Sequence, residues 1–128
     1  MADLTSDLIT TLNAVHITCI VTSGSTISGR GYRCAVQSDG SYNVASISEP
    51  GQVVSDQPSD SGNGQFLGCR IGQSGSIPAI SIEPTSPGNV AYTAATGQFS
   101  QTATSATRIG IWVQGVSASG GLGIVLPD

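Results

Sequence analysis

Charged side chains are scarce in this 128-residue chain, at 9% of its residues, whereas soluble domains average about 25%. Lysine is missing, and the four arginines are scattered along the sequence: Arg30, Arg33, Arg70 and Arg108. A nucleic-acid interface needs a basic stripe, which this scatter does not supply, and the formal net charge is −4. We therefore expect no nucleic-acid partner.

Residues suited to catalysis are also few, because the chain has a single histidine, His16. A Ser-His-Asp triad would have to use it, yet no serine lies in a GxSxG elbow. No pair of carboxylates is marked as an acid and base by its position. We predict no catalytic residue, no cofactor and no enzymatic activity, and a hydrolase with a cryptic carboxylate pair remains the rival interpretation.

The chain has three cysteines: Cys19, Cys34 and Cys69. They form no CxxC motif and leave one thiol over if two pair, so we interpret them as buried free thiols. The single histidine excludes paired-histidine metal motifs. Three acids between residues 48 and 64, Glu49, Asp56 and Asp60, lack the spacing of a calcium loop. We predict no metal site.

Long apolar runs are absent, and none approaches the roughly 20 residues that a transmembrane helix needs. The first residues, MADLTSDLITTLN, lack the basic flank and apolar core of a signal peptide. We expect no membrane partner, and synthesis in the cytoplasm. Because 38% of the 128 residues are hydrophobic, the chain can form one domain with its own core.

Short runs of β-branched and aromatic residues, separated by turns, occupy the sequence from residue 16 onward. Asp39-Gly40 between two apolar runs is a strong hairpin signal, and Thr96-Gly97 marks a similar turn. Strands are predicted at 16–21, 32–37, 42–47, 65–71, 79–83, 90–94, 98–102, 108–114 and 123–126. This spacing predicts an all-β fold, a small barrel or sandwich.

The sequence also repeats itself. GYRCAVQSDGSYNVA, from Gly31, and GNVAYTAATGQFSQT, from Gly88, share a strand, a glycine turn and a strand that opens with an aromatic residue. The following strands are matched in order: 66–71 with 108–113, and 79–82 with 123–126. We predict a single domain, 1–128, in which two similar β-rich halves share one core.

The predicted halves are a first pseudo-repeat at 24–84 and a second at 85–128. The first half contains a long loop, 48–64, of a length that is usually functional or mobile. Residues 1–15 break from the repeat and predict an N-terminal arm. Apolar residues recur in the arm at helix-like spacing: Leu4, Leu8, Leu12 and Val15.

Residues 87–128 carry a resemblance to a known family. The segments are GNVAY from Gly88, GQF from Gly97, RIGIWV from Arg108 and GGLGIVL from Gly120. In this order they resemble the capsid decoration, or head cement, proteins of tailed bacteriophages. Those proteins commonly end with a "G..VY" strand, a glycine turn, an "IGxA" strand, a turn of small residues and a final "V.L" strand. The first half matches only through the repeat.

This resemblance implies a structural protein on the outer capsid surface of a virion. It implies binding to the major capsid protein, commonly as a homotrimer, and stabilisation of contacts between capsid subunits. Added buried area across neighbouring capsomers would supply that stabilisation. An arm that orders on binding can reach over a neighbour, so we predict capsid or subunit contacts for these arm residues: Leu4, Leu8, Leu12 and Val15.

Two further interpretations stay open. A carbohydrate-binding or adhesin-like module of a phage fibre or surface protein would expose an aromatic platform that includes Trp112. The flanking Ile111 and Val113 instead favour a core position for this tryptophan. A minor capsid or tail-tube component would assemble into rings or tubes.

Overall fold

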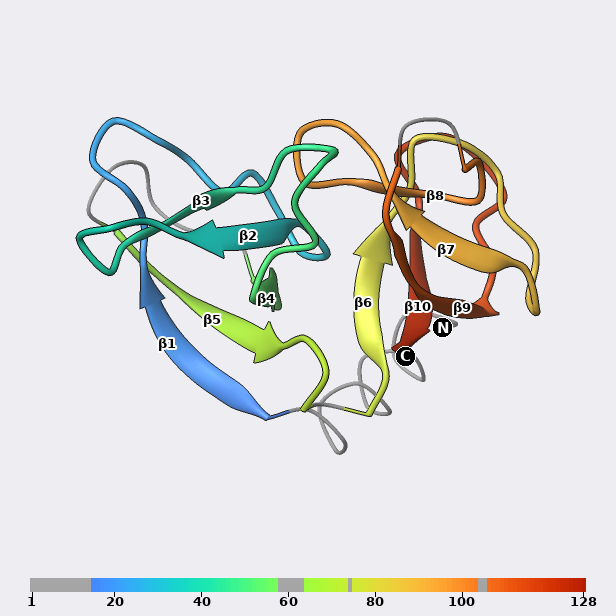
Figure 1. Ribbon diagram of the computed structural model, residues 1–128, viewed down its shortest axis with the longest axis horizontal. Coiled ribbons are helices and arrows are strands. Elements are labelled where there is room, and N and C mark those ends of the chain that lie inside the picture. The colour runs from blue at the N-terminus through green and yellow to red at the C-terminus, as the bar shows by residue number, and fades with distance from the viewer. Residues whose placement is uncertain (1–14, 58–63, 74, 104–105) are drawn as a thin grey trace.

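The computed structural model describes residues 15–57, 64–73, 75–103 and 106–128. Within these ranges the chain forms ten β-strands and no helix, as predicted for an all-β fold (Figure 1). The strands are β1 (His16–Ile20), β2 (Arg33–Val36), β3 (Tyr42–Val44), β4 (Val53–Ser55), β5 (Gln65–Arg70), β6 (Ile77–Ile80), β7 (Val90–Thr93), β8 (Phe99–Ser100), β9 (Arg108–Gln114) and β10 (Leu122–Pro127). The described part of the chain therefore holds no helix long and apolar enough to cross a bilayer.

The described strands form two antiparallel five-stranded sheets. Sheet A has the order β1-β5-β4-β2-β3, and sheet B has the order β6-β10-β9-β7-β8. Figure 1 shows sheet A in blue to green beside sheet B in yellow to red. Residues of both sheets, among them Val54 and Cys69 of sheet A and Trp112 and Val125 of sheet B, share one hydrophobic core. The fold is a sandwich of two sheets.

The two sheets repeat one topology, because adding five to each strand number of sheet A gives the order of sheet B. The strand registers repeat as well, with both partners shifted by 57 positions: Cys34–Val53 becomes Ala91–Gly110, and Val54–Cys69 becomes Ile111–Leu126. In each sheet an isolated parallel bridge also joins the residues after the first strand to the third strand, which curls the sheet: Val21–Tyr42 in sheet A and Ser81–Phe99 in sheet B. The prediction of two similar halves is confirmed.

The strand-by-strand matching of the repeat was partly wrong. The shift of 57 relates β5 to β10 and β4 to β9, whereas the sequence alignment had matched 66–71 with 108–113. The cause is β4, a buried three-residue strand inside the segment 48–64 that was predicted to be a loop. The boundary at 84/85 also divides the halves wrongly, since β6 pairs with β10 in sheet B.

A second core lies inside the curl of sheet A. Its buried members are Cys19, Val21, Ile27, Cys34, Val53 and Phe66. Neighbouring residues of β4 serve both cores, because Val53 faces this cluster and Val54 faces sheet B. All three cysteines of the chain lie in the described part and are free and buried, which confirms their prediction as buried thiols.

Arg33, on β2, connects the two halves of the molecule although its side chain is fully buried. Its guanidinium donates hydrogen bonds to four backbone carbonyls: Ser46 and Glu49 after β3, and Ala94 and Gln98 between β7 and β8. The guanidinium carbon also lies 5.6 Å from the centre of the Phe99 ring. Burial lowers the pKa of Arg33 to about 10, so the side chain stays charged at neutral pH.

Candidate functional site

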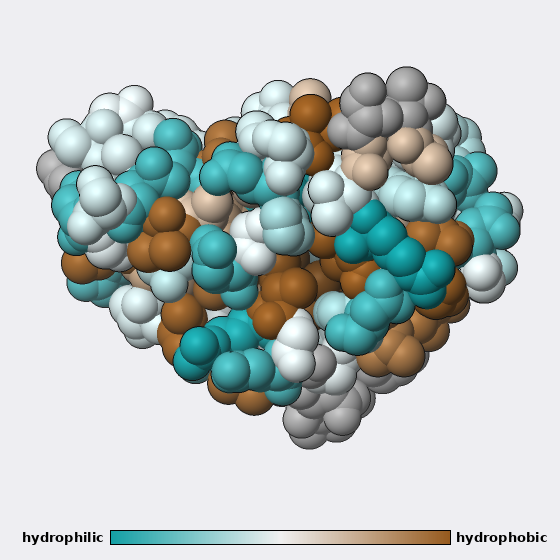
Figure 2. Space-filling model, in the orientation of Figure 1, coloured by the Kyte–Doolittle hydropathy of each residue, from teal (hydrophilic) through white to brown (hydrophobic). Residues whose placement is uncertain are grey.

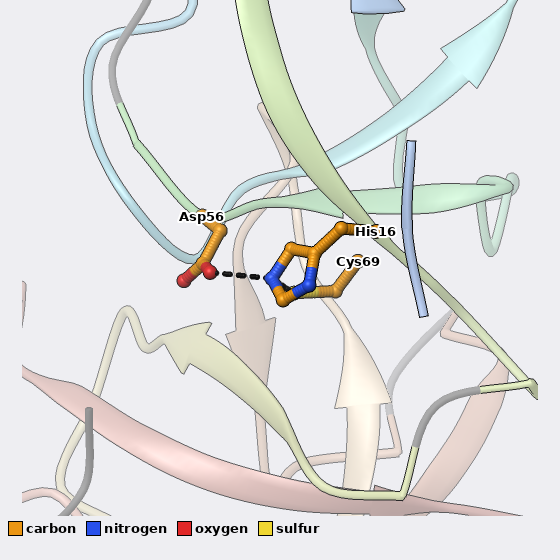
Figure 3. A group of neighbouring side chains, drawn as sticks. All are labelled: His16, Asp56 and Cys69. Atoms are coloured by element: carbon orange, nitrogen blue, oxygen red, sulfur yellow. Dashed lines mark hydrogen bonds and ion pairs between the residues drawn. The ribbon is translucent and has the colours of Figure 1, made fainter. Parts of the chain in front are cut away.

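Three side chains with reactive or metal-binding atoms meet on one face of sheet A: His16, Asp56 and Cys69 (Figure 3). The register of the strands places them there. His16 of β1 and Val54 of β4 both lie opposite Cys69 of β5 in the antiparallel pairing. Directly opposed residues point to the same face of a sheet, and so does Asp56, two residues beyond Val54.

The cluster is held by short polar contacts. His16 Nε2 lies 2.7 Å from Asp56 Oδ2, and Arg30 Nε donates a hydrogen bond of 2.6 Å to Asp56 Oδ1. The Cys69 Sγ atom is 3.5 Å from the same His16 Nε2. Cys69 is fully buried, while the side chains of His16 and Asp56 are 19% and 9% exposed. The cluster therefore borders the core on one side and solvent on the other.

This arrangement does not suit nucleophilic catalysis. Burial raises the pKa of the Cys69 thiol to about 12, and the nearby charge of Asp56 adds to the shift. The thiol is therefore protonated at neutral pH, whereas a cysteine nucleophile acts as the thiolate. A Cys-His-Asp relay also uses opposite nitrogens of the imidazole, but here Asp56 and Cys69 both contact Nε2.

Sequence reasoning did not find this cluster. The sequence places Asp56 with Glu49 and Asp60 as acids of the segment 48–64, but in the structure its partners are His16 and Arg30. The Glu49 carboxylate instead accepts a hydrogen bond from the Ser46 backbone N–H, and Asp60 lies outside the described residues. His16 and Cys69 are 53 positions apart, so only the pairing of β1 with β5 brings them together.

The predicted contact residues are described only in part. Leu4, Leu8 and Leu12 lie outside the described residues. Val15 immediately precedes β1, with 42% of its surface exposed, and its carbonyl accepts a hydrogen bond of 2.9 Å from the Arg70 backbone N–H. The prediction that these residues contact a capsid or another subunit stays a prediction.

Exposed apolar side chains occur on strands of both sheets, and Figure 2 shows brown patches among hydrophilic residues. On sheet B, Ile111 of β9 lies directly opposite Leu126 of β10. Val113 projects from the same face of β9, two residues beyond Ile111. Val113 and Leu126 are each about half exposed, at 50% and 48%. We call Ile111, Val113 and Leu126 the β9–β10 face.

The aromatic side chains offer no open platform for a sugar ring. All six lie in the described part of the chain, and none is exposed: Trp112, Phe66 and Phe99 are buried, and Tyr32, Tyr42 and Tyr92 are partly buried. Trp112 is a core residue, as predicted, and its Nε1 donates a hydrogen bond of 3.1 Å to the carbonyl of Ser100. This placement counts against recognition of carbohydrate by stacking.

Comparison with known proteins shows a similarity of fold but no similarity of sequence to a known family. The sequence matches no protein family and no curated protein. Among solved structures, the chain is similar to the N base of head fiber gp8.5 in bacteriophage phi29, with a TM-score of 0.68 and 15% sequence identity. The match covers 89% of this chain and 95% of the fiber base. Nearly the whole chain therefore shares the fold of the base of a phage head fiber.

Proposed function

We propose that this chain is a structural protein of a bacteriophage virion. It binds the outer surface of the capsid and stabilises contacts between subunits of the major capsid protein. The observation that carries the proposal is the likeness of fold to a phage head fiber base over 89% of the chain. The resemblance of residues 87–128 to capsid decoration proteins, noted from the sequence alone, supports it independently.

The chemistry of the described residues agrees with a role based on contact area. The His16, Asp56 and Cys69 cluster lacks the geometry of a catalytic relay, and we propose that the protein is not an enzyme. Only 9% of the residues are charged, and the β9–β10 face presents half-exposed valine and leucine side chains, with the exposed Arg108–Asp128 ion pair at the end of these strands. The apolar part of this surface costs little to desolvate. Such a surface suits a protein–protein interface.

We propose the β9–β10 face as one contact with the capsid, and residues 1–15 as a second. A standard interface buries about 800 Å² on each partner, while the accessible surface here is 6030 Å². The chain is thus large enough to contact the capsid and also its own copies in a homotrimer. In this proposal the arm residues are the ones predicted from the sequence: Leu4, Leu8, Leu12 and Val15.

The test uses capsid shells of the phage that encodes the chain, prepared without it. Purified protein is added and the bound fraction is measured by co-sedimentation. A Val113→Asp substitution would bury an unpaired charge in the contact, and we expect affinity to fall about tenfold or more, equal to ~1.4 kcal/mol. Val36→Asp is the matched control, because Val36 is similarly exposed, at 44%, on sheet A.

Two outcomes would count against the proposal. If the wild-type chain does not sediment with shells, capsid binding is wrong. If Val113→Asp and Val36→Asp weaken binding equally, the β9–β10 face is not the contact. Deleting residues 1–14 tests the arm separately, since unchanged occupancy on the shells would remove the arm from the proposal.

The alternative function is a carbohydrate-binding or adhesin-like module of a phage fibre. One observation favours it, because the solved structure with a similar fold is part of a head fiber. The buried and partly buried aromatic side chains argue against it. A glycan array decides between them, since selective binding of one glycan class would support the adhesin and no binding would support the capsid protein.

A further inference from the structure

We propose that His16, Asp56 and Cys69 form a binding site for a zinc ion. The three residues come from β1, from the segment after β4 and from β5. Their potential ligand atoms, an imidazole nitrogen, a carboxylate oxygen and a sulfur, all lie within 4.8 Å of one another. This proposal departs from the sequence prediction of no metal site, and it concerns a property of the free chain beyond capsid binding.

The donor set selects the class of metal. Calcium and magnesium prefer shells of oxygen atoms, whereas zinc accepts histidine, cysteine and carboxylate ligands together. A site with one donor of each kind is therefore better suited to zinc than to either hard cation. Three protein ligands leave a fourth tetrahedral position, and the partly exposed His16 and Asp56 side chains border the solvent that could fill it with water.

Two of the three separations between ligand atoms can be compared with the geometry of a zinc site. Bond lengths to zinc and tetrahedral angles require a separation of about 3.5 Å between a nitrogen and a sulfur ligand. The separation of His16 Nε2 and Cys69 Sγ is 3.5 Å. A nitrogen and an oxygen ligand should lie ~3.4 Å apart, while His16 and Asp56 are hydrogen-bonded at 2.7 Å. Zinc would replace this hydrogen bond and widen the pair.

Arg30 gives the site a supporting residue. It bonds Oδ1 of Asp56 and leaves Oδ2 directed at His16. Carboxylates that bind metals are commonly held in this way by a hydrogen-bond donor on the second oxygen. Cys69 would release its thiol proton to solvent on binding zinc, and the charge of Arg30 would balance part of the negative charge of the resulting thiolate and of the carboxylate. Arg30 is thus a positioning residue in the proposal.

A zinc ion at this place would act as a cross-link. It would join β1, which among the described strands pairs with β5, to β5 and to the end of β4. Because a ligand that binds only the folded state raises apparent stability, zinc should raise the unfolding midpoint, and a chelator should reverse the change. The strand β1 follows the predicted N-terminal arm, so the cross-link would anchor the base of that arm.

The test titrates the reduced, metal-free full chain with Zn²⁺ and, in parallel, with Co²⁺ as a spectroscopic probe. We expect one ion per chain and a thiolate-to-cobalt charge-transfer absorption. Because His16 is the single histidine of the chain, its imidazole protons give an unambiguous NMR signal, which Zn²⁺ should shift. A chain that binds neither ion, or binds cobalt without the thiolate absorption, would overturn the proposal.

The variants locate the site. Asp56→Asn keeps the shape of the side chain but should weaken Zn²⁺ binding by about tenfold or more, and Cys69→Ala should abolish the charge-transfer absorption. Cys19→Ala is the matched control, because Cys19 is also a buried thiol but lies in the other core of sheet A. Binding that survives both Asp56→Asn and Cys69→Ala, or that is lost in Cys19→Ala alone, contradicts the assignment. If Cys69→Ala does not fold, the wild-type cobalt spectrum and Asp56→Asn still decide.

Discussion

Replacement of Arg33 by lysine should destabilise the protein strongly although it preserves the charge. Arginine presents donors in a planar fork, whereas lysine has a single ammonium group that cannot span separated acceptors. The four acceptors of Arg33 belong to two loops, at 46–49 and at 94–98, on either side of the guanidinium. A lysine at this position can reach one of these loops at a time.

The size of the effect follows from the lost hydrogen bonds. Residues Ser46 and Glu49 are exposed, so water can replace the arginine at their carbonyls, while Ala94 is buried and Gln98 is partly buried. A lysine that reaches one loop loses the two hydrogen bonds to the other, and at about 1 kcal/mol for each this gives ~2 kcal/mol for Arg33→Lys. For a chain of 128 residues, this corresponds to a fall in Tm of about 7 °C.

Urea unfolding followed by circular dichroism and by tryptophan fluorescence measures this loss. Trp112 is the single tryptophan and lies in sheet B, so fluorescence reports that half of the molecule while circular dichroism reports both. Arg108→Lys is the control, since the Arg108–Asp128 ion pair is exposed, and its unfolding midpoint should not change. A loss below about 1 kcal/mol for Arg33→Lys would refute the role assigned to this side chain.

Three further predictions concern the core and the turns. Gly97→Ala should lower the free energy of unfolding more than Gly40→Ala. Both residues have positive φ angles, of 71° and 86°, but a Cβ at Gly97 would lie 2.7 Å from the Arg33 carbonyl oxygen, while one at Gly40 would meet nothing within 4 Å. The control Gly40→Ala should lose about 1 kcal/mol in urea unfolding, and equal losses for the two variants would contradict the prediction. Trp112→Phe should lose about 2 kcal/mol, since it removes the hydrogen bond to Ser100 and part of a fully buried ring, and an unchanged midpoint would show that this ring is not close-packed. Burial raises the pKa of the thiols from 9.0 to about 11 for Cys19 and to about 12 for Cys34 and Cys69. The folded chain therefore keeps protons that the unfolded chain releases, and stability should fall as the pH rises above 9.0. A Tm that stays constant from there to pH 11 would be inconsistent with these pKa values.

Local sequence patterns were enough to predict most of the strands. The turn at Asp39-Gly40 illustrates why, since its signals are contained within a few residues. Gly40 has a φ angle of 86°, and the Asp39 carboxylate accepts hydrogen bonds from the backbone N–H and hydroxyl of Ser41. A hairpin of this kind is encoded where it forms, so a single sequence reveals it.

The strand β4 shows where such reasoning fails. It has only three residues, and turn-forming residues such as Pro50 and Gly51 surround it, so no alternating pattern has room to develop. Its place is set by pairing with β2 and β5, which are distant in the sequence. Missing β4 displaced the matching of the two halves by one strand.

The His16, Asp56 and Cys69 cluster was beyond prediction for the same reason. No motif links the three residues, which reach one face of sheet A through the register of β1, β4 and β5. Knowledge of the strand order would have been sufficient, because directly opposed residues share a face. Single-sequence patterns report which residues form strands, and they do not report which strands are neighbours.

The proposed function places this chain in a phage virion, and electron cryomicroscopy of such virions tests it most directly. A capsid-binding structural protein predicts density outside the shell into which the two five-stranded sheets fit, in contact with more than one copy of the major capsid protein. Density for the chain inside the shell or along the tail, or its absence from purified virions, would contradict the account.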